Sequence, residues 1–201
     1  MTLEVLSRSA QVSDALHRLA KSTARSVVLV RGSVGSAGSG VIWDRPNLIL
    51  TNHHVVPGEV AEVASADGRR LRARVIRRAP RLDLAALRTE DDLVEHAHIG
   101  DSDHLRVGDL VLAVGNPMGE RNAPSLGILA AAPDDVLRLA ITLRPGNSGG
   151  ALVNAIGEVV GIPHMVAGRG LALAVSTRTV GRFLAGEPVE PDPQSPDVRW
   201  L

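Results

Sequence analysis

A serine surrounded by glycines is the feature that most limits what this chain can fold into. The stretch from Arg144 to Val153 reads Arg-Pro-Gly-Asn-Ser-Gly-Gly-Ala-Leu-Val, so Ser148 stands in glycine-rich backbone directly ahead of an apolar, strand-like run. Because glycine adopts φ > 0 freely, a sharp turn here can expose the hydroxyl and point successive backbone N–H groups into one space. Such groups stabilise an oxyanion. The stretch therefore indicates a nucleophile turn, although Gly-x-Ser-x-Gly can also be a plain loop between strands.

A serine hydroxyl is a weak nucleophile at neutral pH and needs a base whose ring is oriented by a third group. The apolar run from Leu48 to Val56 ends in a polar turn that carries His53 and His54. Another apolar segment opens with Asp83, which is costly to bury unless a group such as a histidine ring hydrogen-bonds to it. The chain order His, Asp, Ser is one in which this constellation recurs. Residue chemistry alone leaves both histidines open as the base.

Several short blocks match, in order, the pattern of one family of bacterial proteases. They occupy residues 38–42, 51–56, 83–85, 100–102, 113–117 and 145–150. On these blocks the sequence resembles trypsin-like (chymotrypsin-fold) serine proteases of the HtrA (Deg) family, and the match runs from about Arg25 to Leu184. The family's Thr-Asn-x-His pattern implies that His54 is the base, with Asp83 and Ser148 completing a catalytic triad.

The resemblance also implies an oxyanion hole at Gly146, Asn147 and Ser148. The backbone N–H groups of Gly146 and Ser148 would hold the oxyanion, and Asn147 between them would shape the turn. Digestive relatives have an aspartate before the serine, which pairs with a newly cut N-terminus. Because the amide of Asn147 cannot form that ion pair, we expect no cleavage-activated zymogen step.

The fold implied by the resemblance is all-β, with two six-stranded antiparallel β-barrels, a short N-terminal helix and a C-terminal helix. Composition agrees, because 44% of the residues are hydrophobic and only 1% aromatic, and short valine-rich segments separated by glycines favour strands. We expect four parts: a helical extension (1–24), a first barrel with His54 and Asp83 (25–104), a second barrel with Ser148 (105–185) and a Pro-rich disordered tail (186–201).

The N-terminal helix is predicted from apolar residues at helical spacing. Val12, Leu16 and Leu19 recur in this way, and either Ser9 or Ser13 could cap a short amphipathic helix that packs against the body. A final helix is expected to begin after Ser176.

Strands are expected at residues 25–31, 41–43, 48–51, 59–65, 69–76, 83–87 and 110–114, with a glycine-serine loop at 32–40. In the hairpin around Asp67-Gly68, alternate residues of the second strand should face the core. Its arginines, Arg70, Arg72 and Arg74, are interpreted as a solvated strand face rather than a patch for an acidic partner.

The specificity pocket is expected to be small and apolar. Aligned with the trypsin fold, Thr142 lies at its base, where an aspartate would select Lys or Arg. Leu143, Met165 and Ala172 are expected nearby, so Val, Ala or Leu should be preferred. The strand from His164 to Val166 should pair with the substrate backbone.

Other partners and cofactors are not expected. The formal net charge is zero, which gives no reason to expect a nucleic acid or an anionic membrane as partner. The glycine-serine loop lacks the lysine of a phosphate-binding motif. A cluster of possible ligands could suggest a metal site, but it falls in a block that matches the family, so no metal ion is expected; its members are His96, His98, Asp101, Asp103 and His104.

The first 25 residues carry scattered charges and no continuous apolar run, and no segment approaches the length of a membrane span. We therefore expect a cytoplasmic location, or a periplasmic or secreted one if the sequence has been trimmed. No segment resembles a PDZ domain. The oligomeric state is open, and a second copy or a partner protein could bind the N-terminal helix or the tail.

The function indicated by these features is that of a serine endopeptidase that cleaves unfolded or extended polypeptides after small aliphatic residues. The alternative is a protease-fold module that binds peptides without cutting them.

Overall fold

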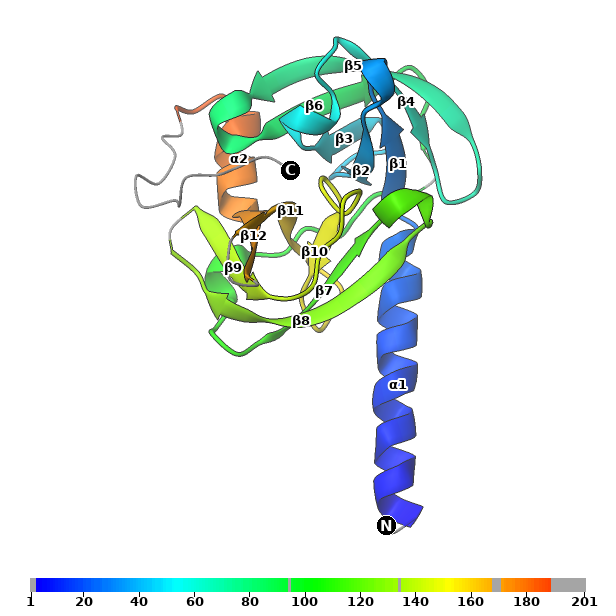
Figure 1. The fold of residues 1–201 in the computed structure, drawn as a ribbon, viewed down its shortest axis with the longest axis vertical. Coiled ribbons are helices and arrows are strands. Elements are labelled where there is room, and N and C mark those ends of the chain that lie inside the picture. Colours follow the sequence, from blue (N-terminus) through cyan, green and yellow to red (C-terminus); the bar gives the residue numbers. More distant parts are fainter. Residues whose placement is uncertain (1–2, 94, 134, 168–170, 189–201) are drawn as a thin grey trace.

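Two closed antiparallel β-barrels form the body of the protein, as predicted (Figure 1). The structure is a computed structural model, and it describes residues 3–93, 95–133, 135–167 and 171–188. The first barrel has the strand order β1-β2-β3-β6-β5-β4 and the second has the order β10-β11-β12-β9-β8-β7. The strands of the first barrel are β1 (Val27–Arg31), β2 (Ala37–Ile42), β3 (Leu48–Thr51), β4 (Val60–Ala64), β5 (Arg70–Ala79) and β6 (Leu84–Thr89). Those of the second are β7 (Leu110–Gly115), β8 (Ala123–Ala131), β9 (Val136–Ala140), β10 (Ala151–Val153), β11 (Val159–Ala167) and β12 (Leu171–Ser176).

Each barrel buries its own aliphatic core. Alternate residues along a strand point to opposite faces, so one face of every strand fills the barrel. In β5 the predicted alternation is present: Ala73 is buried, while Arg70, Arg72 and Arg74 are exposed. The core of the first barrel includes Val28, Val30, Ile42, Ile49, Val63 and Leu87. The core of the second includes Val111, Leu129, Leu137, Leu139, Leu152, Val160 and Ala172.

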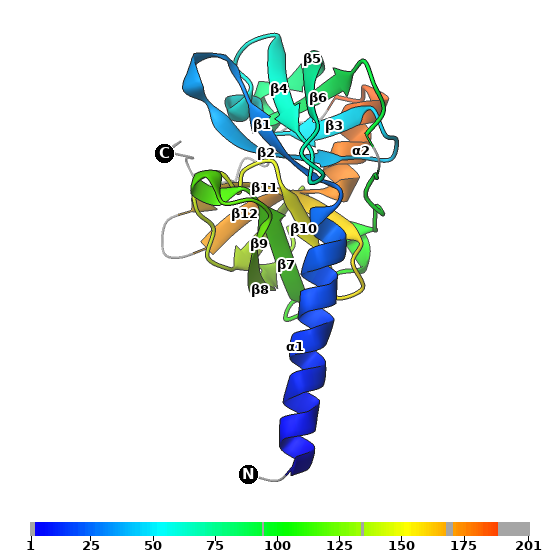
Figure 2. The same cartoon turned by 90° about the vertical axis from the view of Figure 1, so that its right-hand side faces the viewer.

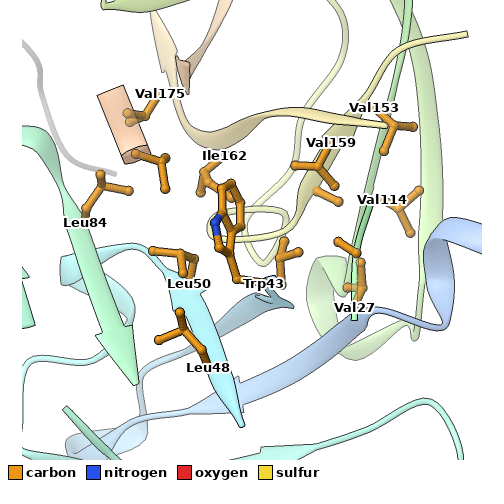
Figure 3. Packing of buried hydrophobic residues seen from close by; sticks show 14 of the residues in the cluster. Val27, Trp43, Leu48, Leu50, Leu84, Val114, Val153, Val159, Ile162 and Val175 are labelled. Carbon is orange, nitrogen blue, oxygen red and sulfur yellow. The ribbon is translucent and has the colours of Figure 1, made fainter. Parts of the chain in front are cut away.

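A third apolar cluster, here called the interface cluster, joins the two barrels (Figure 3). It surrounds Trp43, which is 4% exposed. Its other members come from both barrels and from the C-terminal helix, and include Val27, Leu50, Leu84, Val114, Val153, Val159, Ile162, Val175 and Phe183. Because burial of this surface depends on both barrels, the cluster fixes how the barrels sit relative to each other.

The C-terminal helix α2 (Thr177–Ala185) begins as predicted. The side chain of Ser176 accepts a hydrogen bond from the N–H of Thr179, and Gly186 ends the helix in the left-handed conformation with φ of 85°. Its Phe183 lies in the interface cluster, and the guanidinium of Arg77 in β5 donates to the carbonyl of Phe183. The helix is therefore bound to the first barrel although it follows the last strand of the second.

The N-terminal helix differs from the prediction. α1 (Leu3–Ala24) has 22 residues, so Ser9 and Ser13 lie inside it and do not cap it. Neither glycine nor proline occurs in this segment, so nothing in the sequence ends the helix early. Only its last turns pack on the body, where Leu19 and Ala20 contact the interface cluster. The rest projects away from the barrels (Figures 1 and 2), and Val12 is 59% exposed.

β2 starts earlier than predicted, and β8 was not anticipated. β2 begins at Ala37, inside the segment predicted to be a loop. Its glycines were read as loop residues, but Gly40 serves close packing between strands, because a Cβ there would lie 2.7 Å from Ile49 Cγ2. β8 has Gly127 in its centre and leaves Leu126 and Ile128 half exposed, so its pattern does not resemble a half-buried strand. Most of the predicted tail, from residue 189 onward, lies outside the described residues. Among the helices of the described part, none has the length and apolar character needed to cross a membrane.

Candidate active site

His54 and Asp83 meet at the end of β3. Asp83 follows a short turn (Pro80–Leu82) and has the left-handed conformation, with φ of 53°, which is uncommon for a residue other than glycine. Its carbonyl accepts hydrogen bonds from Asn52 Nδ2 at 2.8 Å and from the N–H of His53 at 3.0 Å. These bonds tie the Asp83 backbone to the turn His53–Val55.

The carboxylate of Asp83 is held entirely by His54 among the hydrogen bonds of the described residues. Oδ1 accepts the His54 backbone N–H at 3.0 Å, and Oδ2 lies 2.7 Å from His54 Nδ1. The Asp83 side chain is 2% exposed and that of His54 is 38% exposed. When Nδ1 donates to this carboxylate, the other ring nitrogen of the neutral imidazole, Nε2, is the acceptor. The ring of His53 instead contacts Arg78.

The residues around Ser148 form a turn, here called the nucleophile turn (residues 144–148), in which every carbonyl accepts a hydrogen bond. The N–H of Asn147 donates to Arg144 O at 3.0 Å, and that of Met118 donates to Pro145 O at 3.0 Å. The remaining three acceptors are Gly146 O (from Ser39 Oγ, 2.7 Å), Asn147 O (from Gly150 N, 3.0 Å) and Ser148 O (from Ser39 N, 2.8 Å). Each of the five carbonyls of the turn is therefore directed toward a donor within the protein.

The N–H groups of the turn are arranged differently. Because a trans peptide directs its C=O and N–H to opposite sides, the bond from Met118 to Pro145 O directs the N–H of Gly146 away from Met118. Gly146 has φ of 101°, and a Cβ there would lie 2.5 Å from Asn116 O. Within the described part of the chain, the N–H groups of Gly146 and Ser148 donate to no backbone acceptor, whereas that of Asn147 is used inside the turn.

The nucleophile turn lies against the segment that carries His54. A Cβ on Gly149 would collide with Ser39 O and Thr51 Oγ1, and would lie 3.1 Å from the N of Asn52. Thr51 and Asn52 directly precede the histidine turn. The structure thus brings His54 and Asp83 into contact, and it places the backbone of the nucleophile turn against the segment that leads to His54.

His164 was predicted to pair with substrate, and the structure adds a contact that the sequence did not reveal. A β-bulge between Pro163 and Met165 re-aims the side chain, so that its Nδ1 lies 3.9 Å from Asp83 Oδ2. The side chain is 10% exposed, and neither ring nitrogen has a hydrogen-bond partner among the described residues. Burial lowers the pKa of His164 to about 4, against a smaller raising effect of Asp83 and together with repulsion from His54.

The residues predicted to form the specificity pocket have different environments. Thr142 is exposed, Leu143 is partly buried against the second barrel's core, and Ala172 is fully buried within that core. Met165 and Val166 belong to β11 and pair with Leu173 and Ala172, while their side chains lie outside the described part of the structure.

Several of the residues considered as possible metal ligands have other partners or lie in pairs. Asp103 pairs with Arg178, and His104 lies 3.6 Å from Asp101. Among the described residues, no group of three or more His, Cys, Asp or Glu side chains could hold a metal ion.

Comparison with known proteins identifies the family. The family model for the trypsin-like peptidase domain matches residues 38–162. A probable periplasmic serine endoprotease DegP-like from Marinomonas sp. is 39% identical over 145 residues, which covers 68% of this chain and 31% of the relative. The serine protease Do-like HtrA of Lactobacillus helveticus is 37% identical over 147 residues, covering 65% of this chain and 36% of the relative. The chain thus spans about a third of the length of these relatives.

A solved structure, the HtrA-type protease AlgW with decapeptide, is similar in fold. Its TM-score is 0.75 at 27% identity, over 84% of this chain and 66% of that chain.

The predicted cytoplasmic location is wrong. It rested on the absence of a continuous apolar run in residues 1–25. The relatives from Marinomonas sp., Halomonas elongata and Pseudomonas fulva are all named periplasmic endoproteases.

The family model, the curated relatives and the two-barrel fold agree with one another and with the resemblance found in the sequence. The chain belongs to the trypsin-like peptidase domain family and is a serine protease domain of the HtrA/Deg type.

Proposed function

We propose that this protein hydrolyses peptide bonds as a serine endopeptidase, with His54, Asp83 and Ser148 as its triad. The observation that carries the proposal is the nucleophile turn: all five of its carbonyls are bound, while the N–H groups of Gly146 and Ser148 are left for a substrate. In this proposal residues 25–104 supply the base and the acid, and residues 105–185 supply the nucleophile.

In the proposed reaction His54 Nδ1 donates to Asp83 and Nε2 is the base. Nε2 takes the proton of the Ser148 hydroxyl as Oγ attacks the substrate carbonyl, and the imidazolium then gives that proton to the leaving amine. Asp83 Oδ2, which lies 2.7 Å from Nδ1, orients the ring and stabilises the imidazolium. Water, activated by the same ring, then releases the acyl group from Ser148.

The oxyanion that forms during each attack would be bound by the N–H groups of Gly146 and Ser148. Such donors act without reorganisation when the protein already holds them in place. Asn147 contributes indirectly, because its N–H closes the turn onto Arg144 O.

The substrate is proposed to be an extended or unfolded polypeptide. β11 pairs with β10 only around Gly161 and Val159, whereas its pairing with β12 continues to Ala167. In the described part of the chain, the other edge of residues 164–166 therefore has no strand partner. A substrate could add there as a strand.

The residue before the cleaved bond is proposed to be small and aliphatic. The proposed pocket contains no charged side chain that would attract Lys or Arg; its residues are Thr142, Leu143, His164, Met165, Val166 and Ala172. Peptides that differ only at this residue would rank Val, Ala and Leu above Lys and Asp. By similarity to the relatives named periplasmic, we place this activity in the periplasm.

Active-site labelling tests the activity directly. At about pH 8, above the ordinary pKa of histidine, a fluorophosphonate probe should label the wild type and not Ser148→Ala. Casein cleavage should fall by orders of magnitude in the variant, because triad members act as a unit. A folded wild type that neither labels nor cleaves, yet binds unfolded casein, would instead support the non-cleaving peptide-binding module.

A further inference from the structure

Ser39, in the first barrel, holds the nucleophile turn at two points. Its N–H donates to Ser148 O at 2.8 Å, and its hydroxyl donates to Gly146 O at 2.7 Å. The side chain is fully buried. One residue therefore binds the carbonyls of both residues whose N–H groups face the proposed oxyanion.

The direction of the Ser39 hydroxyl is fixed by Asn116, in the second barrel. The N–H and the Nδ2 of Asn116 both donate to Ser39 Oγ, at 2.8 and 3.1 Å. A hydroxyl has one proton and two lone pairs, so with both lone pairs engaged its proton is left for Gly146 O. Asn116 is itself anchored, because Nδ2 also reaches Val28 O at 3.1 Å and Oδ1 accepts the N–H of Asn122 at 3.2 Å.

Ser39 is connected to the base as well. The hydroxyl of Thr51 donates to Ser39 O at 2.6 Å, and Thr51 is the last residue of β3 before the turn that carries His54. Ser39 thus lies between the segment that positions the base and the turn that positions the nucleophile.

We propose that Ser39 is a positioning residue that, together with Asn116, keeps the oxyanion hole assembled. This deepens the proposed function and rests on it. The Ser39 hydroxyl fixes the peptide plane after Gly146, and the N–H of Met118 fixes the plane before it. With both planes fixed, Gly146 stays at φ of 101° and its N–H keeps its direction. Without the hydroxyl, Gly146 O keeps only the N–H of Asn116, at 3.4 Å.

The test compares Ser39→Ala with Ser26→Ala. Ser26 is a matched control because it is also buried and its hydroxyl also donates to a backbone carbonyl, that of Thr23, which belongs to neither the nucleophile turn nor the histidine turn. We expect Ser39→Ala to lower kcat about tenfold to a hundredfold, less than the loss of a whole oxyanion donor can cost, with KM changed by less than about twofold. Ser26→Ala should keep the wild-type values.

Two inhibitors separate positioning from general loosening. The Ser148 hydroxyl can add to the carbonyl carbon of a peptide aldehyde and pass its proton to His54, which leaves an oxyanion in the hole. The matching peptide alcohol has no carbonyl at this position and cannot form that adduct. Ser39→Ala should weaken the aldehyde by about the same factor as kcat/KM and leave the alcohol unchanged. If Ser39→Ala behaves like Ser26→Ala, or weakens both inhibitors equally, the proposal is overturned.

Two further measurements complete the test. If Ser39→Ala does not fold, Asn116→Ala takes its place. This variant removes the Nδ2 donor to Ser39 Oγ and keeps the backbone N–H donor. A ratio of aldehyde to alcohol affinity that stays at the wild-type value would then overturn the proposal. If the wild type neither labels nor cleaves, the proposed function fails separately. Hydrogen exchange over residues 144–150 still tests the role of Ser39. Exchange there should be faster in Ser39→Ala than in Ser26→Ala, and equal rates would contradict the proposal.

Discussion

His164 places a second imidazole beside Asp83, the proposed acid, in a nearly closed environment. Its Nδ1 is 3.9 Å from Asp83 Oδ2, too far for a hydrogen bond but close enough for the charges to interact. A protonated His164 would compete with His54 for the same carboxylate. Because burial lowers the pKa of His164 to about 4, its ring is neutral at neutral pH and does not compete with His54 for Asp83.

The cost of keeping His164 neutral should appear in the pH dependence of stability. The unfolded chain binds a proton at the ordinary histidine pKa of about 6.5, and the folded chain binds it only near 4. The unfolded state therefore holds more protons between these values, so the free energy of unfolding falls as the pH is lowered through this window. The contribution of His164 reaches about 3 kcal/mol by pH 4.

Urea unfolding at several pH values between about 7 and 4.5 measures this effect. His164→Leu should lose less stability across the window than the wild type. His98→Leu, at an exposed histidine, should keep the wild-type dependence. An equal pH dependence in wild type and His164→Leu would show that another group carries it.

Residue types predicted the candidate triad, but not the contacts that support it. A histidine, an aspartate and a serine among glycines are visible in the sequence, and the choice between His53 and His54 came from the family pattern. The bond from Ser39 to Gly146 joins residues 107 positions apart, and His164 reaches Asp83 through a β-bulge. Neither contact can be recognised from neighbouring residues in the sequence, because both depend on how the two barrels are arranged.

At the scale of the elements, α1 combines two different environments in one helix. Its last turns bury Leu19 and Ala20 against the interface cluster, and Leu19 Cδ1 would lie 3.3 Å from a Cβ placed on Gly157. The earlier turns leave the body, so Val12 is 59% exposed. Apolar spacing predicted the helix correctly, whereas its length follows from the lack of glycine and proline and its packing from the position of the barrels.

Alanine substitutions along α1 should therefore have unequal effects on stability. Leu19→Ala should lower the free energy of unfolding by about 1–2 kcal/mol, less than the 2–5 kcal/mol typical of fully buried leucines, because Leu19 is only partly buried. Val12→Ala should change it by less than about 0.5 kcal/mol. Urea unfolding of both variants measures the difference, and a similar loss at Val12 would mean that the projecting part of the helix is covered in solution.

At the scale of the whole molecule, the candidate site depends on how the barrels are docked. His54 and Asp83 belong to the first barrel and Ser148 to the second, and the interface cluster lies between them. The sequence predicted both barrels through the resemblance. It could not predict the docking, because the interface cluster draws residues from eight strands and from α2, and most of them are aliphatic like the residues inside a barrel.

Removing one methylene from either of two buried isoleucines should separate the effect of barrel docking on activity from the effect of lost stability. Ile162 lies in the interface cluster and Ile49 in the core of the first barrel, and both are fully buried. Changing either to valine should lower the free energy of unfolding by about 0.5–1.5 kcal/mol. Only Ile162→Val should slow fluorophosphonate labelling of Ser148, because Ile162 precedes Pro163, whose carbonyl accepts the N–H of Gly149 beside the nucleophile.

The expected loss in labelling rate is several-fold. A displacement of about 1 Å can cost about a hundredfold in rate, and a void of one methylene shifts its surroundings by less than that. Labelling is measured under conditions in which both variants are folded, so a difference between them cannot arise from unfolded protein. Equal labelling rates would mean that the hydrogen bonds of Ser39, rather than the apolar interface, hold the nucleophile turn against the first barrel.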